Sequence, residues 1–295
     1  MKNKESCLIK KRDYYSIFFS KLIRKRCFII SCIILTIIFL ASLFVTLTVD
    51  KSEYMNIDFT KSFIPPCKEY LFGTNEFGQN FFFQIFVGSF NTIKLCFLAS
   101  IINLLLGTLL GIIWGHNTKI DNLMIFIRNI FNSIPLPFFY IVVISAIGSG
   151  FWPMIFVITF LGWANLACLI RNNLIIIRYK DYNVFSHINN TPSYKIAIHN
   201  YLPHLLPIIF STFAVSFLEA ASVEVTLSYL GFHTGENNIS LGYLLHNALT
   251  SNNWFDYPYL FLMPLLVIFI INIAFYYIGK TISDVSMKED ESCLK

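Results

Sequence analysis

Six apolar stretches, each long enough to cross a lipid bilayer, constrain this chain more than any other feature. A bilayer-spanning helix needs about 20 mostly apolar residues. A backbone exposed to lipid must satisfy its own hydrogen bonds, and a helix does so within one segment. The sequence therefore predicts an all-α integral membrane protein with six transmembrane helices. The stretches are Cys27–Val49, Ile93–Gly115, Leu123–Gly148, Trp152–Ile177, Leu205–Phe232 and Tyr259–Gly279.

The composition excludes an ordinary soluble domain. Charged residues make up only 13% of the chain, against roughly 25% in soluble proteins. The first apolar stretch is longer than the core of a cleaved signal peptide, which is about 7–15 residues, and no small-residue cleavage site follows it. We therefore expect residues 27–49 to stay in the mature protein as an anchored helix.

The distribution of Lys and Arg predicts the orientation. Residues 1–26 hold nine of them, and sixteen in total fall on the side that includes both termini and the polar insert 178–204. Three fall on the other side, in residues 50–86. Cytoplasmic segments carry the excess of positive charge, so we expect both termini and the insert to be cytoplasmic. The net charge of +5 then follows from topology beside anionic lipid and indicates no nucleic-acid partner.

This orientation predicts five consecutive regions. A basic cytoplasmic N-terminus (1–26) precedes the first transmembrane helix (27–49) and an external loop (50–86). A membrane core of five helices (88–280) follows and contains the insert 178–204. A cytoplasmic tail (281–295) ends the chain.

The chain lacks the motifs of an enzyme. It has no glycine-rich phosphate loop, no HExxH and no GxSxG sequence. Its seven cysteines show neither a CxxC pair nor a spacing with histidine that is typical of metal sites. We predict no catalytic residue, no metal and no cofactor in this chain.

Five charged residues fall within the apolar stretches. Lys94, Arg128 and Arg171 are near helix ends, where we expect their long side chains to reach the interface. Glu219 and Glu224 lie deeper, where a charge costs about 2.5–3.5 kcal/mol and marks a functional or a paired site. At about 100° per residue they point some 140° apart, so each could line a translocation path or pair with another helix.

Local signals predict several further features. Glycines at 107, 111 and 115 form a stripe that lets a neighbouring helix approach closely. Pro135 and Pro137 are expected to kink the third span. Phe72–Asn80 reads as a tight turn in which Asn80 caps the next helix. Ser240–Leu249 is a short amphipathic segment.

The insert 178–204 is longer than the usual helix-to-helix turn of about 2–8 residues. Asp181–Ile188 can form a short helix with Asp181 as its cap. The turn Asn189–Pro192 precedes a second helix, Tyr194–Tyr201, which we expect Pro203 to end. Two short helices would form a platform for a partner; the alternative is a long loop without a partner.

An ordered series of motifs resembles the permease subunits of ABC importers in the bacterial inner membrane, specifically the C-type subunit of the dipeptide/oligopeptide group. Phe72–Asn80 and Glu224–Phe232 resemble two of its motifs, and Leu202 with Pro203 matches the end of its EAA loop. The chain differs from this group at Asn75 and Gln79, where the group has Asp and Arg.

This resemblance implies a type-1 ABC permease core at 88–280 in a multi-pass protein of the cytoplasmic membrane. It also implies four partner subunits in the lipid bilayer or bound to its faces: a homologous second permease, two cytoplasmic ATPases that bind ATP and Mg, and an extracytoplasmic solute-binding protein. The expected cargo is di- or oligopeptides. The alternatives are an antimicrobial peptide or nickel chelate, a degenerate scaffold that transports nothing, and a secondary transporter.

The resemblance also assigns the residues that would couple this chain to the ATPases. Val184, Phe185 and Ser186 occupy the EAA positions of the loop, and Asn190 occupies its glycine position. We expect Asn190, Leu202 and Pro203 to shape the docking platform and Val184–Ser186 to contact the ATPase. Phe185 is a bulky residue where the group has alanine.

Overall fold

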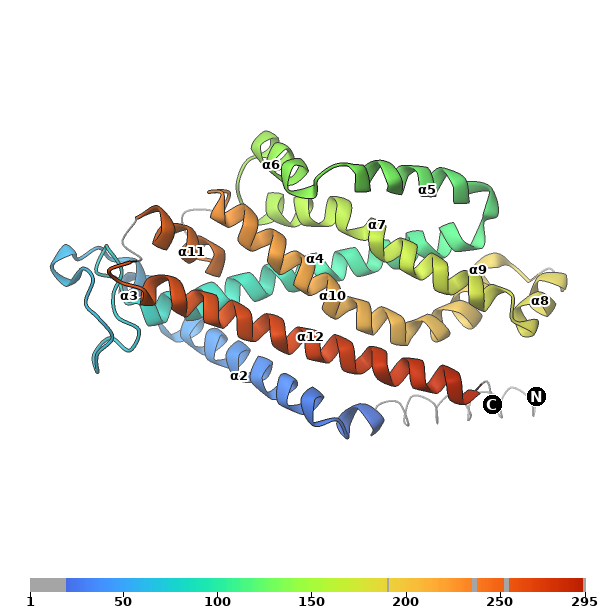
Figure 1. The fold of residues 1–295 in the computed structure, drawn as a ribbon, viewed down its shortest axis with the longest axis horizontal. Helices are drawn as coiled ribbons and strands as arrows, with labels where there is room; N and C mark the ends of the chain where they lie inside the picture. Colours follow the sequence, from blue (N-terminus) through green and yellow to red (C-terminus); the bar gives the residue numbers. More distant parts are fainter. Residues whose placement is uncertain (1–19, 190, 235–237, 252–254, 294–295) are drawn as a thin grey trace.

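The computed structural model describes residues 20–189, 191–234, 238–251 and 255–293, and these residues are almost entirely helical (Figure 1). Across these ranges the only β pairing is one isolated bridge between Thr74 and Asn80. The all-α fold is therefore confirmed. The helices are α2 (Arg26–Thr48), α3 (Lys51–Met55), η1 (Phe59–Lys61), α4 (Phe81–His116), α5 (Thr118–Ser133), α6 (Leu136–Ile147), α7 (Phe151–Arg178), α8 (Asp181–Ile188), α9 (Ser193–Ile196), η2 (Ala197–Tyr201), α10 (Leu202–Tyr229), α11 (Leu241–Thr250) and α12 (Tyr259–Cys293).

Five continuous helical segments are long and apolar enough to cross a membrane, and a sixth span is broken. The continuous ones are α2, α4, α7, the run Ser193–Tyr229 and the Tyr259–Ser286 part of α12. The third expected span, Leu123–Gly148, is not one helix, because α5 and α6 meet at an angle of 87°. Pro135 is the N-cap of α6 and Pro137 lies in its first turn. Each proline lacks a backbone N–H, and it also disfavours helix at the residue before it, so the kink that we expected is a complete break.

The long helices run side by side, with the short elements gathered at their two ends (Figure 1). One end carries α3, α11 and the loop 56–80. The other end carries α8 and α9, together with the start of α2 and the end of α12. This is the arrangement expected if both termini share one side of the membrane with the insert. That this side is the cytoplasm stays a prediction.

The second span belongs to a helix that is longer than a bilayer is thick. Asn80 caps α4 as predicted, since its side-chain oxygen accepts a hydrogen bond from Phe82 N at 3.1 Å. The 36 residues of α4 extend about 54 Å at 1.5 Å per residue, against about 30 Å for the hydrocarbon layer. Part of α4 must therefore extend beyond the hydrocarbon layer, and we expect this part to be its first turns, beside the loop 56–80.

The glycine stripe of α4 packs against α7, as the sequence predicted. A Cβ atom added at Gly111 would lie 2.7 Å from Ala167 O and 2.8 Å from Ile170 Cβ. A Cβ atom at Gly107 would overlap Leu166. Neither position has room for a side chain, so the two helices meet at backbone distance.

The apolar core lies between the long helices. Its largest cluster joins α4, α7, α10 and α12, and within it the rings of Phe217 and Phe275 stack with centroids 3.6 Å apart. A second cluster, which includes Leu174, Ile196 and Tyr201, joins α7 to the helices at the α8–α9 end. The insert is therefore packed onto the membrane helices.

We expect Gly111→Ala to destabilise the protein, because the new methyl group would force α4 away from α7. Overpacking of this kind costs about 1–3 kcal/mol. Thermal unfolding of the detergent-solubilised protein measures the effect. Leu109→Ala, at an exposed position of the same helix, is the control. An unchanged midpoint for Gly111→Ala would contradict the close packing.

Candidate functional site

The polar insert forms two short helices, of which the first is confirmed and the second ends differently from the prediction. α8 covers Asp181–Ile188 as expected. The second helix is not closed by Pro203, because the helical run continues from Ser193 to Tyr229. Through η2, which is a π-helical turn, Leu202 N donates to Ala197 O five residues back. Pro203 then lies in the first turn of α10, where a missing N–H is tolerated.

Two asparagines tie α8 to its neighbours. Asn183 is fully buried, and its Nδ2 donates to Ile177 O at 2.7 Å, near the end of α7. Asn200 Nδ2, in η2, donates to Asn183 Oδ1 at 2.8 Å and to Ser186 Oγ at 3.3 Å. The sequence analysis did not single out Asn183 for this role. No local sequence signal set Asn183 apart, because its partners Ile177 and Asn200 lie outside α8.

The predicted coupling residues divide into exposed and packed groups. Val184 and Phe185 are 41% and 66% exposed and present apolar surface. Ser186 is half-buried and faces Asn200, while Leu202 and Pro203 are half-buried at the start of α10. Asn190 lies outside the described residues. The exposed pair is thus free to contact a partner, and Ser186 serves the internal structure of the insert.

An ion pair beside the insert was missed in the sequence analysis. Arg171 of α7 forms a double hydrogen bond with Asp121 of α5, with its Nε at 3.0 Å from Asp121 Oδ1. Trp114 Nε1 donates to the same carboxylate oxygen at 2.6 Å, and its ring lies under the guanidinium. We expected Arg171 to reach the interface by itself. Instead it joins the ends of α4, α5 and α7, because a charge near the membrane is stabilised by pairing.

The two intramembrane glutamates lie in different surroundings. Glu224 is fully buried and accepts a hydrogen bond from Ser228 Oγ at 3.1 Å. It also interacts with the hydroxyl of Ser240, the N-cap of α11, so it belongs to the contact between α10 and α11. Glu219 is exposed and lines a cavity of about 480 Å³. Glu224 therefore lies in a contact between helices and Glu219 at a cavity; that either residue lines a translocation path stays a prediction.

The end with α3, α11 and the loop 56–80 carries a network of amide side chains. Asn75 Nδ2 donates to Gln79 Oε1 at 2.8 Å, and Gln79 Nε2 donates to Met55 O at 2.7 Å. Gln84 Nε2, from the first turn of α4, donates to Tyr54 O at 3.0 Å. Gly78 adopts φ +72° against the carbonyl of Asp58, where a side chain would clash. The turn predicted at Phe72–Asn80 is confirmed, and it attaches the outer loop to α4.

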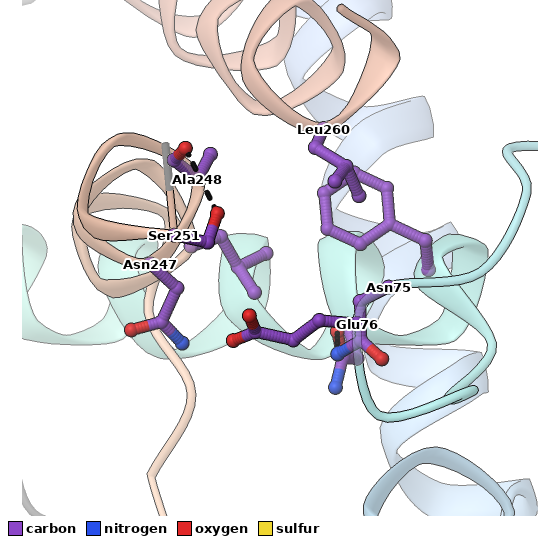
Figure 2. Close-up of a pocket in the computed structure, with 9 residues that line it drawn as sticks. Asn75, Glu76, Asn247, Ala248, Ser251 and Leu260 are labelled. Atoms are coloured by element: carbon purple, nitrogen blue, oxygen red, sulfur yellow. Dashed lines mark hydrogen bonds between the residues drawn. The ribbon is translucent and has the colours of Figure 1, made fainter. Parts of the chain in front are cut away.

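A small pocket lies between this turn and α11. Figure 2 shows Asn75 and Glu76 facing Asn247 and Ser251, with Leu260 of α12 above them. Burial raises the pKa of Glu76 above its ordinary value. The pocket is too small for a substrate, and it marks the contact between the outer loop and α11.

Comparisons with known proteins point to one family. Residues 107–284 match the family described as "binding-protein-dependent transport system inner membrane component". The chain is 30% identical over 278 residues to the oligopeptide transport system permease protein AmiD of Streptococcus pneumoniae, covering 93% of this chain and 89% of the relative. It is 25% identical to OppC of Lactococcus lactis, covering 87% of this chain and 88% of the relative, and 24% identical to OppC of Bacillus subtilis, covering 86% and 83%. Both OppC proteins are also named oligopeptide transport system permease proteins.

Asn183→Ala should loosen α8 from the membrane helices. The substitution removes the hydrogen bonds that Asn183 makes with Ile177 O and with Asn200 Nδ2, at a cost of about 1–3 kcal/mol. Hydrogen exchange of the α8 amides should become faster by a corresponding factor. Asn189→Ala, at an exposed position, is the control and should leave exchange unchanged. Equal exchange in both variants would refute the role of Asn183.

Glu76→Gln should stabilise the protein at neutral pH but not in acid. Since the folded-state pKa of Glu76 is raised, the folded state binds a proton more readily than the unfolded state. The unfolding free energy therefore falls as pH rises from the unfolded-state pKa of Glu76 through its folded-state pKa. Glutamine does not ionise, so the variant does not lose this stability at neutral pH. Melting of both proteins between pH 4 and 8 checks this, with exposed Glu53→Gln as the control. A gain that does not depend on pH would exclude this explanation.

Proposed function

This chain belongs to the binding-protein-dependent transport system inner membrane component family, and we propose that it moves peptides across the cytoplasmic membrane as the C-type permease subunit of an ATP-driven importer. The observation that carries this proposal is the likeness to oligopeptide permeases over nearly the whole chain. Two features of the structure agree with it: the exposed apolar side chains of α8 at one end of the helices, and the cavity between α5, α6, α7 and α10. The chain is a transport subunit and not an enzyme.

The complete importer requires partners. A homologous second permease would lie beside this chain in the bilayer, and two cytoplasmic ATPases would bind ATP and Mg. A solute-binding protein would deliver the peptide on the outer side, which in the expected orientation is the end with α3, α11 and the loop 56–80. The site residues of this chain serve docking and passage, and the hydrolysis of ATP belongs to the ATPases.

Force from the ATPases would enter through α8. Val184 and Phe185 are exposed on this helix, and Ile188 adds a third exposed apolar side chain at 68%. Their apolar surface at the membrane-distal end fits a groove on a protein partner. Asn183 and Asn200 then connect α8 to α7 and α10. Both of these helices line the cavity, so a movement of α8 would reach the path through rigid elements.

Phe185→Glu should uncouple ATP hydrolysis from uptake. A carboxylate at this position would have to be desolvated in the contact with the ATPase, and we expect a loss of uptake of about tenfold or more. Uptake of labelled peptide into proteoliposomes is measured beside ATP hydrolysis in the same preparation. Phe185→Leu keeps the apolar surface and is the control. Normal uptake by the Phe185→Glu variant in an assembled complex would refute the docking role.

The same preparation separates the remaining alternatives. Uptake that requires both ATP and the binding protein supports the importer. Uptake driven by an ion gradient without ATP would indicate a secondary transporter, and capture of the subunit without ATPases would indicate a scaffold. The ligand of the co-purified binding protein distinguishes oligopeptides from a nickel chelate or an antimicrobial peptide.

A further inference from the structure

A cavity of about 480 Å³ lies where the broken span meets α7 and α10. The last turn of α5 and the first turns of α6 both line it, so the break itself faces the cavity. Non-helical backbone at membrane depth is tolerated where it is buried in protein or lines a water-filled cavity. The volume falls within the range of about 300–1,000 Å³ that is typical of small-molecule sites. The cavity can therefore hold part of a peptide.

One face of α10 forms a wall of this cavity and carries its charge. Among the described residues that line the cavity, Glu219 is the one with a charged side chain. No ion pair or hydrogen bond joins its carboxylate to another described residue. Glu224 points elsewhere and is fully buried. The wall residues recur at the spacing of one helix face: Val215, Leu218, Glu219, Ser222, Val223, Thr226 and Leu227.

The polar groups that line the cavity with Glu219 are all uncharged: the hydroxyls of Tyr140, Ser222 and Thr226 and the amides of Asn132 and Asn165. Ser222 Oγ donates its hydrogen to Leu218 O at 2.9 Å, and Thr226 Oγ1 donates to Ser222 O at 2.7 Å. A hydroxyl has one hydrogen and two lone pairs, so each of these oxygens keeps acceptor capacity. Pro137, on the opposite wall, has no N–H to offer. A carboxylate with no cation among the described residues that line its cavity attracts a cation, and an ammonium group can donate several hydrogen bonds to it and to the neighbouring hydroxyl oxygens.

We infer that Glu219 recognises the ammonium groups of peptides in transit, so that this path favours positively charged peptides over negatively charged ones. The inference rests on the proposed function, because it assumes that peptides cross this cavity. Two kinds of ammonium group present the same chemistry, the peptide N-terminus and the lysine side chain. Asn132 of α5 and Asn165 of α7 also line the cavity, and each amide has an oxygen that can accept from an ammonium group.

The test measures a ratio of uptake rates in proteoliposomes that contain the complete importer. One ratio compares alanyl-lysyl-alanine with alanyl-glutamyl-alanine, and the other compares alanyl-lysyl-alanine with its N-acetylated form. The same binding protein is used throughout, so its own preference cancels when a variant is compared with the parent. In Glu219→Gln at least one ratio should fall about tenfold, which corresponds to ~1.4 kcal/mol.

Matched variants give this experiment its controls. Glu219→Asp keeps the carboxylate and should retain most of the preference. Glu69→Gln makes the same chemical change at an exposed position of the outer loop and should leave both ratios as in the parent. Asn165→Asp adds a second carboxylate to the cavity and should raise the lysine-to-glutamate ratio. Which of the two ratios falls in Glu219→Gln identifies the ammonium group that is recognised.

Three outcomes would overturn the inference. Both ratios could stay unchanged in an assembled Glu219→Gln complex, or uptake of all peptides could fall equally, which would indicate a structural role. If Glu219→Gln does not assemble with the second permease, Asn165→Asp decides, and a lysine-to-glutamate ratio that does not rise refutes the inference. A parent complex that takes up no peptide with its binding protein would instead contradict the proposed function.

Discussion

The close contact between α4 and α7 is the interaction on which the rest of the structure depends. Lipid is as apolar as the helices, so helices in a membrane associate through van der Waals packing and polar contacts. Glycines at 107, 111 and 115 allow this packing by bringing the α4 backbone onto α7. The ends of the same two helices then carry Trp114 and Arg171, which hold Asp121 at the start of α5. A shift of α4 would therefore also move α5 and the end of α7 that precedes the insert.

The break between α5 and α6 lines the cavity that contains Glu219. A break in lipid would leave backbone carbonyls without partners, but here it faces a cavity shared with α7 and α10. The two glutamates of α10 illustrate the same constraint. Glu224 is buried and has hydroxyl partners, whereas Glu219 is exposed to the cavity. A buried carboxylate needs hydrogen bonds, which Glu224 has, whereas Glu219 faces open space in the cavity.

The departures from the permease pattern have physical explanations in the structure. Asn75 and Gln79, which replace an Asp and an Arg, hydrogen-bond to each other at 2.8 Å. A neutral amide pair thus holds the outer turn where the related group has residues of opposite charge. Phe185 replaces a small alanine and is 66% exposed, so its larger ring costs no packing inside this chain. The larger ring of Phe185 therefore affects only the fit of a partner that covers α8.

Signals that act within a few residues were predictable from the sequence. The cap at Asn80, the amphipathic α11 and the helix α8 all follow from hydrogen bonds or periodicity inside one segment. Apolar length likewise predicted the position of the membrane helices. The glycine stripe predicted that α4 has a close neighbour, although it did not say which helix that would be.

The sequence by itself determined the helices, their apolar faces and the positions where a proline removes a backbone hydrogen bond. Only the tertiary structure decided that the prolines of the third span produce an 87° break while Pro203 leaves its helix continuous. It also paired Asp121 with Arg171 and Asn183 with Asn200, and it placed Glu219 but not Glu224 on a cavity. The physical reason is that the sequence shows where a proline removes a backbone hydrogen bond or where a charge must be desolvated, and each costs free energy locally. The partner that offsets this cost comes from another segment and is chosen by how the helices pack.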